Sequence, residues 1–313
     1  MMAPQNPMQE TAKQRMLRMI GHLEWLRGRD RVLRAFSHPD RQKPEPFEVD
    51  FFGLSYSGNM ANFIDWTVFY YGAFAINELR LLAALAQALH AQGKPVSFYD
   101  VGANIGHHTL FMSANADQVF SFEPFATVRD EMKRKLNHAG VRNATAFPVA
   151  LGNRNETAAF RPPTGANQGT GTLGETLPDN ASTESIPVQV VRGDDFFPAN
   201  QLPPISLLKM DVEGFEVNAI EGMRETLWRD RPPILMEIQR DNPSGPRKSA
   251  RIESLLYPDH LLYEVGSAPG QYTLRPFSTG NTEEALVLPA ELAGIIPGTG
   301  LHRVNVPPNA VGE

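Results

Sequence analysis

The sequence predicts an α/β protein with a mainly parallel sheet and a helical extension at its N-terminus. Between Val96 and Ile238, short runs rich in β-branched and aromatic residues alternate with amphipathic helical segments. Parallel strands joined by helical crossovers give this alternation. The first of these runs ends in a glycine-punctuated turn from Asp100 to Gly106. Open α/β sheets bind their ligands at such turns.

The first 48 residues predict a leader followed by a helix. The first dozen residues are polar and are expected to be disordered. From Met16 to Phe36, apolar residues recur at helical spacing, with arginines on the opposite face. This pattern indicates a surface helix that packs on the main domain or on a second subunit. A basic amphipathic helix lying on a membrane is the alternative, which Glu24 and Asp30 disfavour because they interrupt the positive face.

Residues 49–95 are expected to form a lead-in segment that packs on the core. Its first half, from Phe51 to Phe74, is rich in aromatic residues. Asn77 is predicted to cap a helix from Glu78 to about Ala91, because an apolar stripe follows it at helical spacing.

The main domain is predicted over residues 96–290, followed by a loose tail at 291–313. Strands are expected at 96–101, 118–122, 144–150, 205–210 and 234–238, with helices at 106–116, 124–139 and 215–227. Two more strands are expected at 261–265 and 284–288. An insertion at 152–204 contains candidate strands at 157–161 and 186–191. Between them, the polar stretch 165–172 is either functional or a disordered surface excursion.

Composition limits the class of protein. The net charge is -6 and there is no dense run of Lys or Arg, so nucleic acid is a poor candidate partner. The chain has no cysteine, which excludes disulfides, thiolate nucleophiles and cysteine-based metal sites. No apolar stretch is long enough to span a bilayer, and the N-terminus lacks a secretory signal. We therefore expect a cytoplasmic protein without stable membrane insertion, and the N-terminal helix is a candidate contact for a homo-oligomer.

The turn after the first strand predicts a nucleoside site. Gly102 lets the backbone turn sharply, and Asn104 is the residue type that best tolerates left-handed angles after glycine. Glu123 ends the second strand, where a carboxylate accepts hydrogen bonds from both hydroxyls of a ribose. Asp100 would repel the pyrophosphate of a dinucleotide, so it favours a ligand with an ammonium group, such as S-adenosylmethionine. This charge and the lack of a Gly-x-Gly-x-x-Gly turn disfavour the first alternative, an NAD-linked oxidoreductase.

A second acidic block follows the fourth strand. It runs from Lys209 to Glu216 and places Asp211 and Glu213 at the same edge of the predicted sheet as the turn. Glu237 ends the fifth strand and adds another acid there. A lysine beside two carboxylates is also compatible with a plain ion pair.

Three blocks together resemble the FkbM family of methyltransferases. They are Tyr99-Asp100-Val101-Gly102-Ala103-Asn104-Ile105-Gly106, Ser121-Phe122-Glu123-Pro124 and Lys209-Met210-Asp211-Val212-Glu213-Gly214-Phe215-Glu216. The resemblance covers about residues 96–240. It implies a class I methyltransferase (Rossmann-like) fold with a seven-stranded sheet, helices on both faces and S-adenosylmethionine as cofactor. It also implies O-methylation of a small molecule or sugar.

The resemblance also implies roles for individual residues. Glu123 would hold the ribose of the methyl donor, Ala150 would border the adenine together with its neighbour Val149, and Asp211 would lie near the sulfonium and the acceptor. The amino-acid end of the donor would be lined by Asp100, Gly102, Asn104 and Gly106.

A hydroxyl acceptor must lose its proton, so a base is expected near the donor. The candidates are His107, His108, Asp211 and Glu237. No spacing of His, Asp or Glu predicts a dedicated metal site, although a loosely bound Mg²⁺ at Asp211 stays open. Two further alternatives also stay open: a non-catalytic module with this fold, and a methyltransferase acting on protein or nucleic acid.

Overall fold

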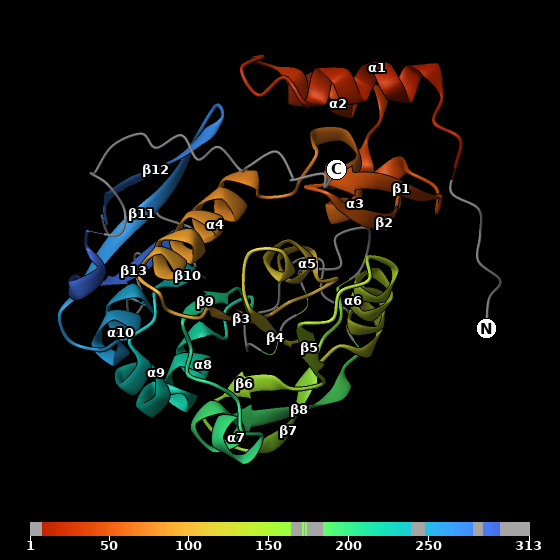
Figure 1. The fold of residues 1–313 in the computed structure, drawn as a ribbon. Coiled ribbons are helices and arrows are strands. Elements are labelled where there is room, and N and C mark those ends of the chain that lie inside the picture. Colours follow the sequence, from red (N-terminus) through yellow and green to blue (C-terminus); the bar gives the residue numbers. More distant parts are fainter. Residues whose placement is uncertain are drawn as a thin grey trace.

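A computed structural model describes residues 8–163, 171, 173, 184–238, 248–277 and 284–294. Its centre is an eight-stranded sheet in the order β12-β11-β13-β10-β9-β3-β4-β5 (Figure 1). The strands from β10 to β5 run parallel, whereas β13 and β12 pair antiparallel with their neighbours. The parallel strands are β3 (Ser97–Val101), β4 (Gln118–Phe122), β5 (Ala144–Phe147), β9 (Leu207–Met210) and β10 (Ile234–Glu237). The others are β11 (His260–Ala268), β12 (Gln271–Pro276) and β13 (Glu284–Pro289), which leads into the short 3₁₀ turn η2 (Ala290–Leu292).

Helices cover both faces of this sheet, as Figure 1 shows. One face carries α4 (Ile76–Ala91), α5 (His107–Ser113) and α6 (Ala126–His138). The other carries α8 (Glu216–Gly222), α9 (Arg224–Asp230) and α10 (Lys248–Leu255). Successive strand residues point to opposite faces, so Phe98 joins the first core and Tyr99 the second. Strands covered on both faces read as continuous apolar runs, and this explains why the central strands could be located in the sequence.

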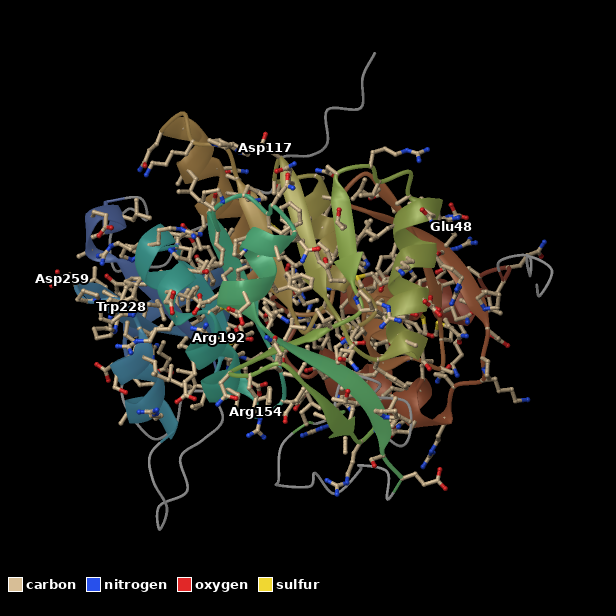
Figure 2. All side chains as sticks on the ribbon, turned by 90° about the horizontal axis from the view of Figure 1, so that it is seen from below. Glu48, Asp117, Arg154, Arg192, Trp228 and Asp259 are labelled. Atoms are coloured by element: carbon tan, nitrogen blue, oxygen red, sulfur yellow. The ribbon has the colours of Figure 1, made fainter. Side chains whose placement is uncertain are left out.

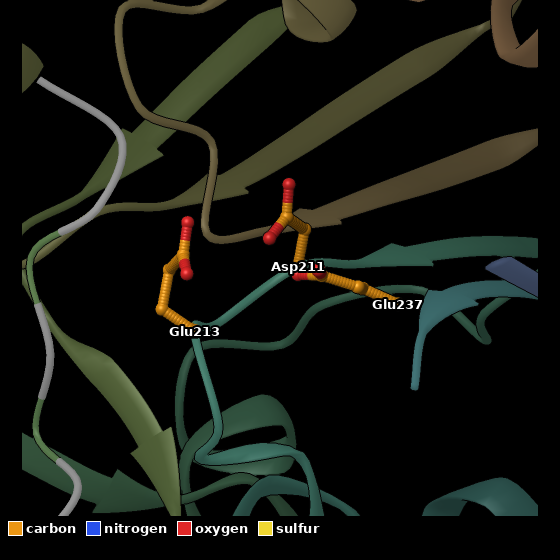
Figure 3. Close-up of side chains that lie close together, drawn as sticks. All are labelled: Asp211, Glu213 and Glu237. Atoms are coloured by element: carbon orange, nitrogen blue, oxygen red, sulfur yellow. The ribbon is translucent and has the colours of Figure 1, made fainter. Parts of the chain in front are cut away.

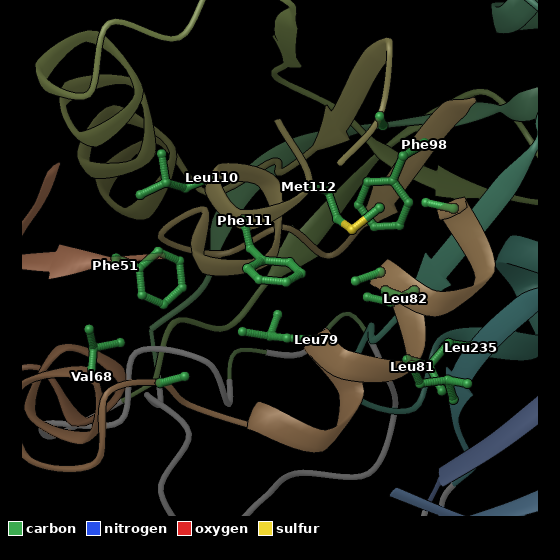
Figure 4. Packing of buried hydrophobic residues seen from close by; sticks show 14 of the residues in the cluster. Phe51, Val68, Leu79, Leu81, Leu82, Phe98, Leu110, Phe111, Met112 and Leu235 are labelled. Atoms are coloured by element: carbon green, nitrogen blue, oxygen red, sulfur yellow. The ribbon is translucent and has the colours of Figure 1, made fainter. Parts of the chain in front are cut away.

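The apolar stripe of α4 forms much of the first core. Leu79 and Leu82 are fully buried and lie with Phe111 of α5 and Phe98 of β3 in one cluster (Figure 4). The predicted cap of this helix is wrong. Ala75 occupies the N-cap position in a left-handed conformation, and the Asn77 amide oxygen accepts a hydrogen bond from Arg80 instead.

The N-terminal extension is a pair of helices rather than one continuous helix. Helix α1 (Ala12–Gly21) begins at a capping box made by Thr11 and Gln14, and α2 (Arg29–Phe36) begins after Gly28, whose positive φ breaks the helical path. A 3₁₀ turn, η1 (Pro39–Arg41), then leads to the hairpin of β1 (Pro46–Phe51) and β2 (Leu54–Asn59) and to α3 (Phe63–Tyr71). Figure 1 shows these elements gathered at one end of the molecule, beyond α5 and α6.

Several predicted boundaries differ from the structure. The third strand was expected to continue to residue 150, but it stops at Phe147, and Ala150 begins β6 (Ala150–Gly152) of a separate sheet. Pro148, which lacks a backbone N–H, lies at the break. The second sheet has the order β6-β8-β7, with β7 (Glu156–Phe160) and β8 (Ile186–Arg192) close to the two strands expected in the insertion. Helix α7 (Gly193–Ala199) follows them.

The main sheet has one strand more than the seven implied by the family resemblance. The extra strand is β12, which follows the tight turn at Gly270 and buries Tyr272 and Leu274 on one of its faces. The helix expected at 215–227 is divided into α8 and α9 at Met223. Most of the polar stretch 165–172 and the tail from residue 297 lie outside the described residues.

A buried ion pair ties the lead-in segment to the main domain. Lys135 of α6 is fully buried, and its Nζ donates to Asp65 Oδ1 of α3 at 2.7 Å and to the Ser57 carbonyl at 2.8 Å. The Tyr56 hydroxyl donates to the same carboxylate oxygen. Burial lowers the pKa of Lys135, and the charge of Asp65 opposes this shift. The sequence pattern did not reveal the pair, because Lys135 lies on a helix whose composition is mostly polar.

Replacing Lys135 by methionine is expected to lower the free energy of unfolding by about 3–5 kcal/mol, because it leaves the Asp65 carboxylate buried without its cation. Urea unfolding at neutral pH measures this. Lys133→Met, on the exposed side of the same helix, is the matched control and should change stability by less than about 0.5 kcal/mol. Equal stability of the two variants would contradict the structural role of the pair.

Within the described residues, no single helix has the length and apolar character to cross a bilayer. The bent pair Phe63–Tyr71 and Ile76–Ala91 meets the criteria of length and composition only when its two helices, which meet at 80°, are taken together.

Candidate functional site

The acidic residues predicted at one edge of the sheet do lie at the same edge. Strands β10, β9, β3 and β4 are consecutive and parallel in the sheet, so their carboxyl ends lie at one edge. From β3 the chain proceeds to β4 and β5 on one side and later returns to β9 and β10 on the other. This reversal is the topological switch point at which open α/β sheets bind ligands.

The turn after β3 adopts the backbone conformation that its sequence predicts. Gly102, Asn104 and Gly106 all have positive φ. A Cβ atom on Gly102 would lie 1.8 Å from the Asp211 carbonyl oxygen, so only glycine allows this turn to approach β9 so closely. The Gly102 amide donates to the Phe122 carbonyl at 3.0 Å, which fixes the turn against β4.

An inner cavity lies beside this turn. The predicted site residues Gly102, Asn104, Glu123, Ala150 and Asp211 all line it. Its remaining wall is mainly apolar and aromatic. This part is made by Phe63, Ile64, Phe74, Val101, Phe122, Pro124, Phe125, Val128, Leu151, Phe160, Gly171, Leu173, Val212, Glu213 and Phe215.

Glu123 is held rigidly at the cavity wall. Its two carboxylate oxygens accept hydrogen bonds from the backbone amides of Asn104 at 3.0 Å and Phe125 at 2.8 Å. Burial raises the pKa of Glu123 to about 7, although both amides and Arg129 act in the opposite direction. Each oxygen retains a lone pair for a further donor, so the carboxylate is fixed in position to accept hydrogen bonds from a ligand.

The inner cavity has an excess of negative charge. Glu123, Asp211 and Glu213 line it, and no Lys or Arg is among its described lining residues. Burial, followed by the charges of Asp211 and Glu216, raises the pKa of Glu213 to about 7. Such a cavity fits a cationic ligand better than it fits a ligand that carries a pyrophosphate.

Two of the residues expected to contact the ligand lie behind the turn instead. Asp100 is fully buried and does not line the cavity; its Oδ2 accepts a hydrogen bond from the Thr109 hydroxyl at 2.6 Å. Its Oδ1 has no hydrogen-bond partner among the described residues. Gly106 is the N-cap of α5 and faces Met132. The negative charge expected from Asp100 is therefore supplied at the cavity wall by Asp211 and Glu213, which do line the cavity.

Three carboxylates converge in a second cavity next to the inner cavity. We call this second cavity the acidic recess. Asp211, Glu213 and Glu237 each have an oxygen within 4.8 Å of the others (Figure 3). Lys209 Nζ donates a hydrogen bond to Asp211 Oδ2 at 3.2 Å. Burial, then the charges of Asp211 and Glu213, raises the pKa of Glu237 to about 8. The three could coordinate a divalent cation. The sequence placed all three acids at this edge of the sheet, but their spacing did not predict a dedicated metal site.

The two histidines after the turn lie in the protein interior. His108 Nε2 lies 3.3 Å from a Glu78 carboxylate oxygen, and neither histidine is among the described residues lining the cavities around the turn. The backbone amide of Phe74 donates to His107 Nε2 at 3.3 Å. Burial holds the pKa of His107 well below its usual value. His108 is therefore placed as a partner of Glu78 rather than as a base that reaches a ligand.

Glu78 and Glu284 are site residues that the sequence analysis missed. Both line the acidic recess. Burial and the neighbouring Glu78 raise the pKa of Glu284 to about 11. Burial alone would raise the pKa of Glu78, but its contact with His108 lowers it to about 2. Glu78 lies in the first turn of α4 and Glu284 begins β13. Because these elements are far apart in the sequence, only the fold brings the two acids together.

A larger outer groove adjoins both cavities, with a volume of about 660 Å³. It shares Phe63 and Phe74 with the inner cavity and Phe74, Glu78 and Glu284 with the recess, so all three meet at Phe74. Both aromatic and charged side chains line the groove. Its other lining residues are Glu24, Arg29, Asp30, Arg34, Trp66, Thr67, Tyr71, Ala73, Ala75, Ile76, Asn77, Glu264, Val265 and Ser267.

Comparison with known proteins adds independent findings. The family model described as the methyltransferase FkbM domain matches residues 100–265. The chain is similar to the hexuronic acid methyltransferase AglP of Haloferax volcanii, with 30% identity over 132 residues that cover 41% of this chain and 50% of AglP. It is also similar to methyltransferase 1 of Beauveria bassiana, with 27% identity over 156 residues that cover 44% of this chain and 63% of that protein. The matched regions thus span half to under two thirds of these relatives.

Among solved structures, the chain is similar to the methyltransferase FkbM of Methylobacillus flagellatus KT. The identity is 16% and the TM-score is 0.39, over 62% of this chain and 43% of that one. A methyltransferase of Agrobacterium tumefaciens, described as SAM-dependent, gives 10% identity and a TM-score of 0.44 over 80% of this chain and 72% of that one.

Proposed function

The chain belongs to the FkbM family of methyltransferases, and from this premise we propose that it transfers a methyl group from S-adenosylmethionine to a hydroxyl oxygen of a sugar or another small molecule. The family match also supports the predicted class I methyltransferase fold, which here carries an N-terminal helical extension. The observation that carries the proposal is the inner cavity. It combines a fixed carboxylate at the end of β4 with an excess of negative charge and no Lys or Arg among its described lining residues.

The residues of the inner cavity fit the methyl donor part by part. Glu123 accepts hydrogen bonds from the ribose hydroxyls, and the apolar wall around Ala150 and Phe160 accommodates the adenine. Asp211 and Glu213 stabilise the positively charged end of the methyl donor, where its sulfonium lies. The bound donor would supply an already activated methyl group, so the protein's contribution is largely position and charge.

The acidic recess supplies the base in this proposal. Glu237 lies beside Asp211 at the point where the recess meets the inner cavity. A pKa near 8 makes its carboxylate a proton acceptor of suitable strength close to neutral pH. Asp211 orients the reacting groups, and the position of His108 behind Glu78 assigns it the role of a positioning residue.

The outer groove is the acceptor site in this proposal. Its volume lies within the range of about 300–1,000 Å³ usual for small-molecule sites. Half-buried aromatic rings at Phe63, Tyr71 and Phe74 offer apolar faces for the C–H side of a sugar ring, and nearby carboxylates and Asn77 offer acceptors for its hydroxyls. The name of the Haloferax volcanii relative favours a sugar as the acceptor.

Two measurements test the proposal. Isothermal titration calorimetry should detect binding of S-adenosylhomocysteine, and a labelled-methyl transfer screen over neutral sugars, hexuronic acids and secondary metabolites should yield a methylated product. Donor binding without any transfer would favour the alternative of a non-catalytic module. Binding of NAD in place of S-adenosylhomocysteine would favour the oxidoreductase alternative, which the acidic character of the described cavity lining disfavours.

The affinity for S-adenosylmethionine is expected to rise by roughly three- to tenfold between pH 6 and pH 8. Glu123 and Glu213, both with pKa raised to about 7, lose their protons over this range and add negative charge to the inner cavity that would hold the sulfonium. S-Adenosylhomocysteine lacks the sulfonium charge, so its affinity should change less. Calorimetry of both ligands at the two pH values measures the difference, and parallel pH dependences would contradict the role of the cavity charge.

Replacing Tyr71 by alanine is expected to raise the KM for the acceptor by about two- to tenfold, because an aromatic face contributes roughly 0.5–1.5 kcal/mol beyond its buried area. Tyr71 lines the outer groove and not the inner cavity, so the Kd for S-adenosylhomocysteine should stay unchanged. Tyr71→Phe keeps the ring and serves as the control. An altered donor affinity with unaltered acceptor KM would place the acceptor elsewhere.

A further inference from the structure

The two N-terminal helices expose an unusual amount of apolar surface. Large hydrophobic side chains that are more than a third exposed occur at seven described positions, and six of them lie between residues 16 and 36. Trp25 and Met19 are each 68% exposed and Phe36 is 62% exposed. The seventh, Trp228, lies on α9, at the opposite end of the molecule (Figures 1 and 2). Exposed apolar residues gathered in one segment mark a contact with a partner or a membrane.

The same segment is strongly basic in an acidic protein. Residues 12–36 contain seven Lys or Arg and two acidic residues, whereas the whole chain has a net charge of -6. Arg27, Arg31 and Arg34 make no ion pair with another described residue, and all three are exposed. Of the two acids, Glu24 is engaged by Arg80, with its oxygens 2.6 and 2.9 Å from the guanidinium nitrogens. Arg15 and Arg18 lie 3.9 and 3.3 Å from Glu10 carboxylate oxygens, so the positive charge that is not neutralised by its surroundings is that of α2 and of the loop before it.

The hairpin of α1 and α2 is fixed to the body, so its exposed side chains are not simply a loose end. Leu17 and Leu33 are buried in the main core. A Cβ atom on Gly21 would lie 2.1 Å from the Tyr70 carbonyl oxygen, which shows how closely α1 approaches α3. Glu24 also accepts a hydrogen bond from the Gly270 amide of the β11–β12 turn. The apolar and basic side chains are thus presented outward from a rigid support.

We propose that the α1–α2 hairpin docks on an anionic lipid surface, with Trp25, Phe36 and the exposed methionines of α1 entering the interface and the arginines contacting lipid phosphates. This combination of apolar and basic side chains is the chemistry of peripheral membrane binding. A second copy of the chain is the competing occupant of this apolar surface. Charge disfavours it, because two such hairpins facing one another would bring two sets of unpaired arginines together.

The position of the hairpin also brings the outer groove close to the lipid surface. Arg29, Asp30 and Arg34 of α2 line the outer groove, so the groove opens beside the docked surface. A hydroxylated acceptor carried by a lipid would then reach the groove without leaving the membrane surface. Docking itself does not depend on the proposed methyl transfer and is measured without it.

Sedimentation with vesicles tests the docking. The full chain should bind vesicles of phosphatidylcholine mixed with phosphatidylglycerol and should bind phosphatidylcholine vesicles at least about tenfold more weakly. High salt should release it. The emission of Trp25 should shift to shorter wavelength on binding, while buried Trp66 and the distant Trp228 stay as a constant background.

Variants separate the two components of the surface. Trp25→Ser together with Phe36→Ser should lower the vesicle partition coefficient by at least about tenfold, and Arg27→Gln together with Arg31→Gln by about tenfold. These side chains are exposed, so melting temperatures should stay close to that of the parent protein. Trp228→Ser is the matched control and should leave vesicle binding unchanged. Failure to bind anionic vesicles, or a dimer in solution that Trp25→Ser dissociates, would overturn the proposal.

Discussion

Replacing Glu123 by alanine is expected to weaken the binding of S-adenosylhomocysteine by more than about tenfold. A charged hydrogen bond contributes roughly 1.5–3 kcal/mol, and about 1.4 kcal/mol corresponds to a tenfold change in Kd. The carboxylate is fixed by the backbone amides of Asn104 and Phe125, so it meets the ribose hydroxyls without first losing conformational freedom. The variant therefore loses the hydrogen bonds to the ribose together with the fixed position of the acceptor that makes them.

Because Glu123 also accepts two backbone hydrogen bonds, its removal affects the turn as well as the ligand. Glu123→Gln is the control that separates these effects. The amide keeps the shape of the side chain and one acceptor oxygen, so it should bind the ligand with an affinity between those of the parent protein and the alanine variant. Circular dichroism and urea unfolding establish that each variant is folded. Unchanged affinity in a folded Glu123→Ala protein would reject the assignment to the ribose.

The sequence predicted those parts of the fold and site that depend on local pattern. Parallel strands buried on both faces are continuous apolar runs, so β4 was located at its observed bounds. The turn at Gly102 and Asn104 was predicted because few residue types tolerate its backbone angles, and both residues adopt them. Five of the expected cofactor residues do line one cavity, since strand ends in a parallel sheet lie at a common edge.

The parts that depend on long-range packing could not be predicted. Asp100 lies near the end of β3 and Asp211 directly follows β9, and the two look equivalent in sequence. Only the observed packing shows that Asp100 turns beneath α5 to Thr109 while Asp211 reaches the cavity. Glu78 and Glu284 meet across more than half of the chain, and no local spacing connects them.

The N-terminal segment shows the same limit. Its periodicity predicted a helix packed by an apolar face that starts at Met16 and continues through Leu33. The structure buries Leu33, but in the first helix it buries Leu17 and leaves Met16 56% exposed. Yet apolar residues are spread around both helices, so burying one stripe leaves Met19 and Phe36 exposed. Periodicity predicts that the segment is helical, but only the fold shows which of its apolar side chains are buried.

Replacing Glu237 by glutamine is expected to lower kcat by about a hundredfold, because a general base contributes typically about 10²–10⁴-fold. The Kd for S-adenosylhomocysteine should stay within about threefold, since Glu237 lines the acidic recess rather than the inner cavity. In the parent protein, kcat should rise with pH and level off above about pH 8, as the carboxyl group loses its proton. This rise should disappear in the variant, and a rise that persists would assign the base to another group.

The same substitution is expected to stabilise the protein at alkaline pH. The pKa of Glu237 is raised in the folded state by burial and then by Asp211 and Glu213, so folding favours its protonated form. That contribution is complete below the ordinary pKa of a glutamate and is lost as the pH rises through about 8. Above that pH, three carboxylates repel one another in the recess, and glutamine removes one of the charges. The melting temperature of Glu237→Gln should therefore exceed that of the parent protein at about pH 9, with little difference at about pH 5.

A divalent cation in the recess would reverse this expectation, which gives the experiment a clear control. If Asp211, Glu213 and Glu237 held such an ion, its binding would remove their mutual repulsion and Glu237→Gln would weaken both the site and the fold. Chelation with EDTA would then abolish activity, and Mg²⁺ would restore it. An activity unaffected by EDTA, together with a more stable and slower Glu237→Gln variant, would support a base whose raised pKa is maintained at the expense of stability.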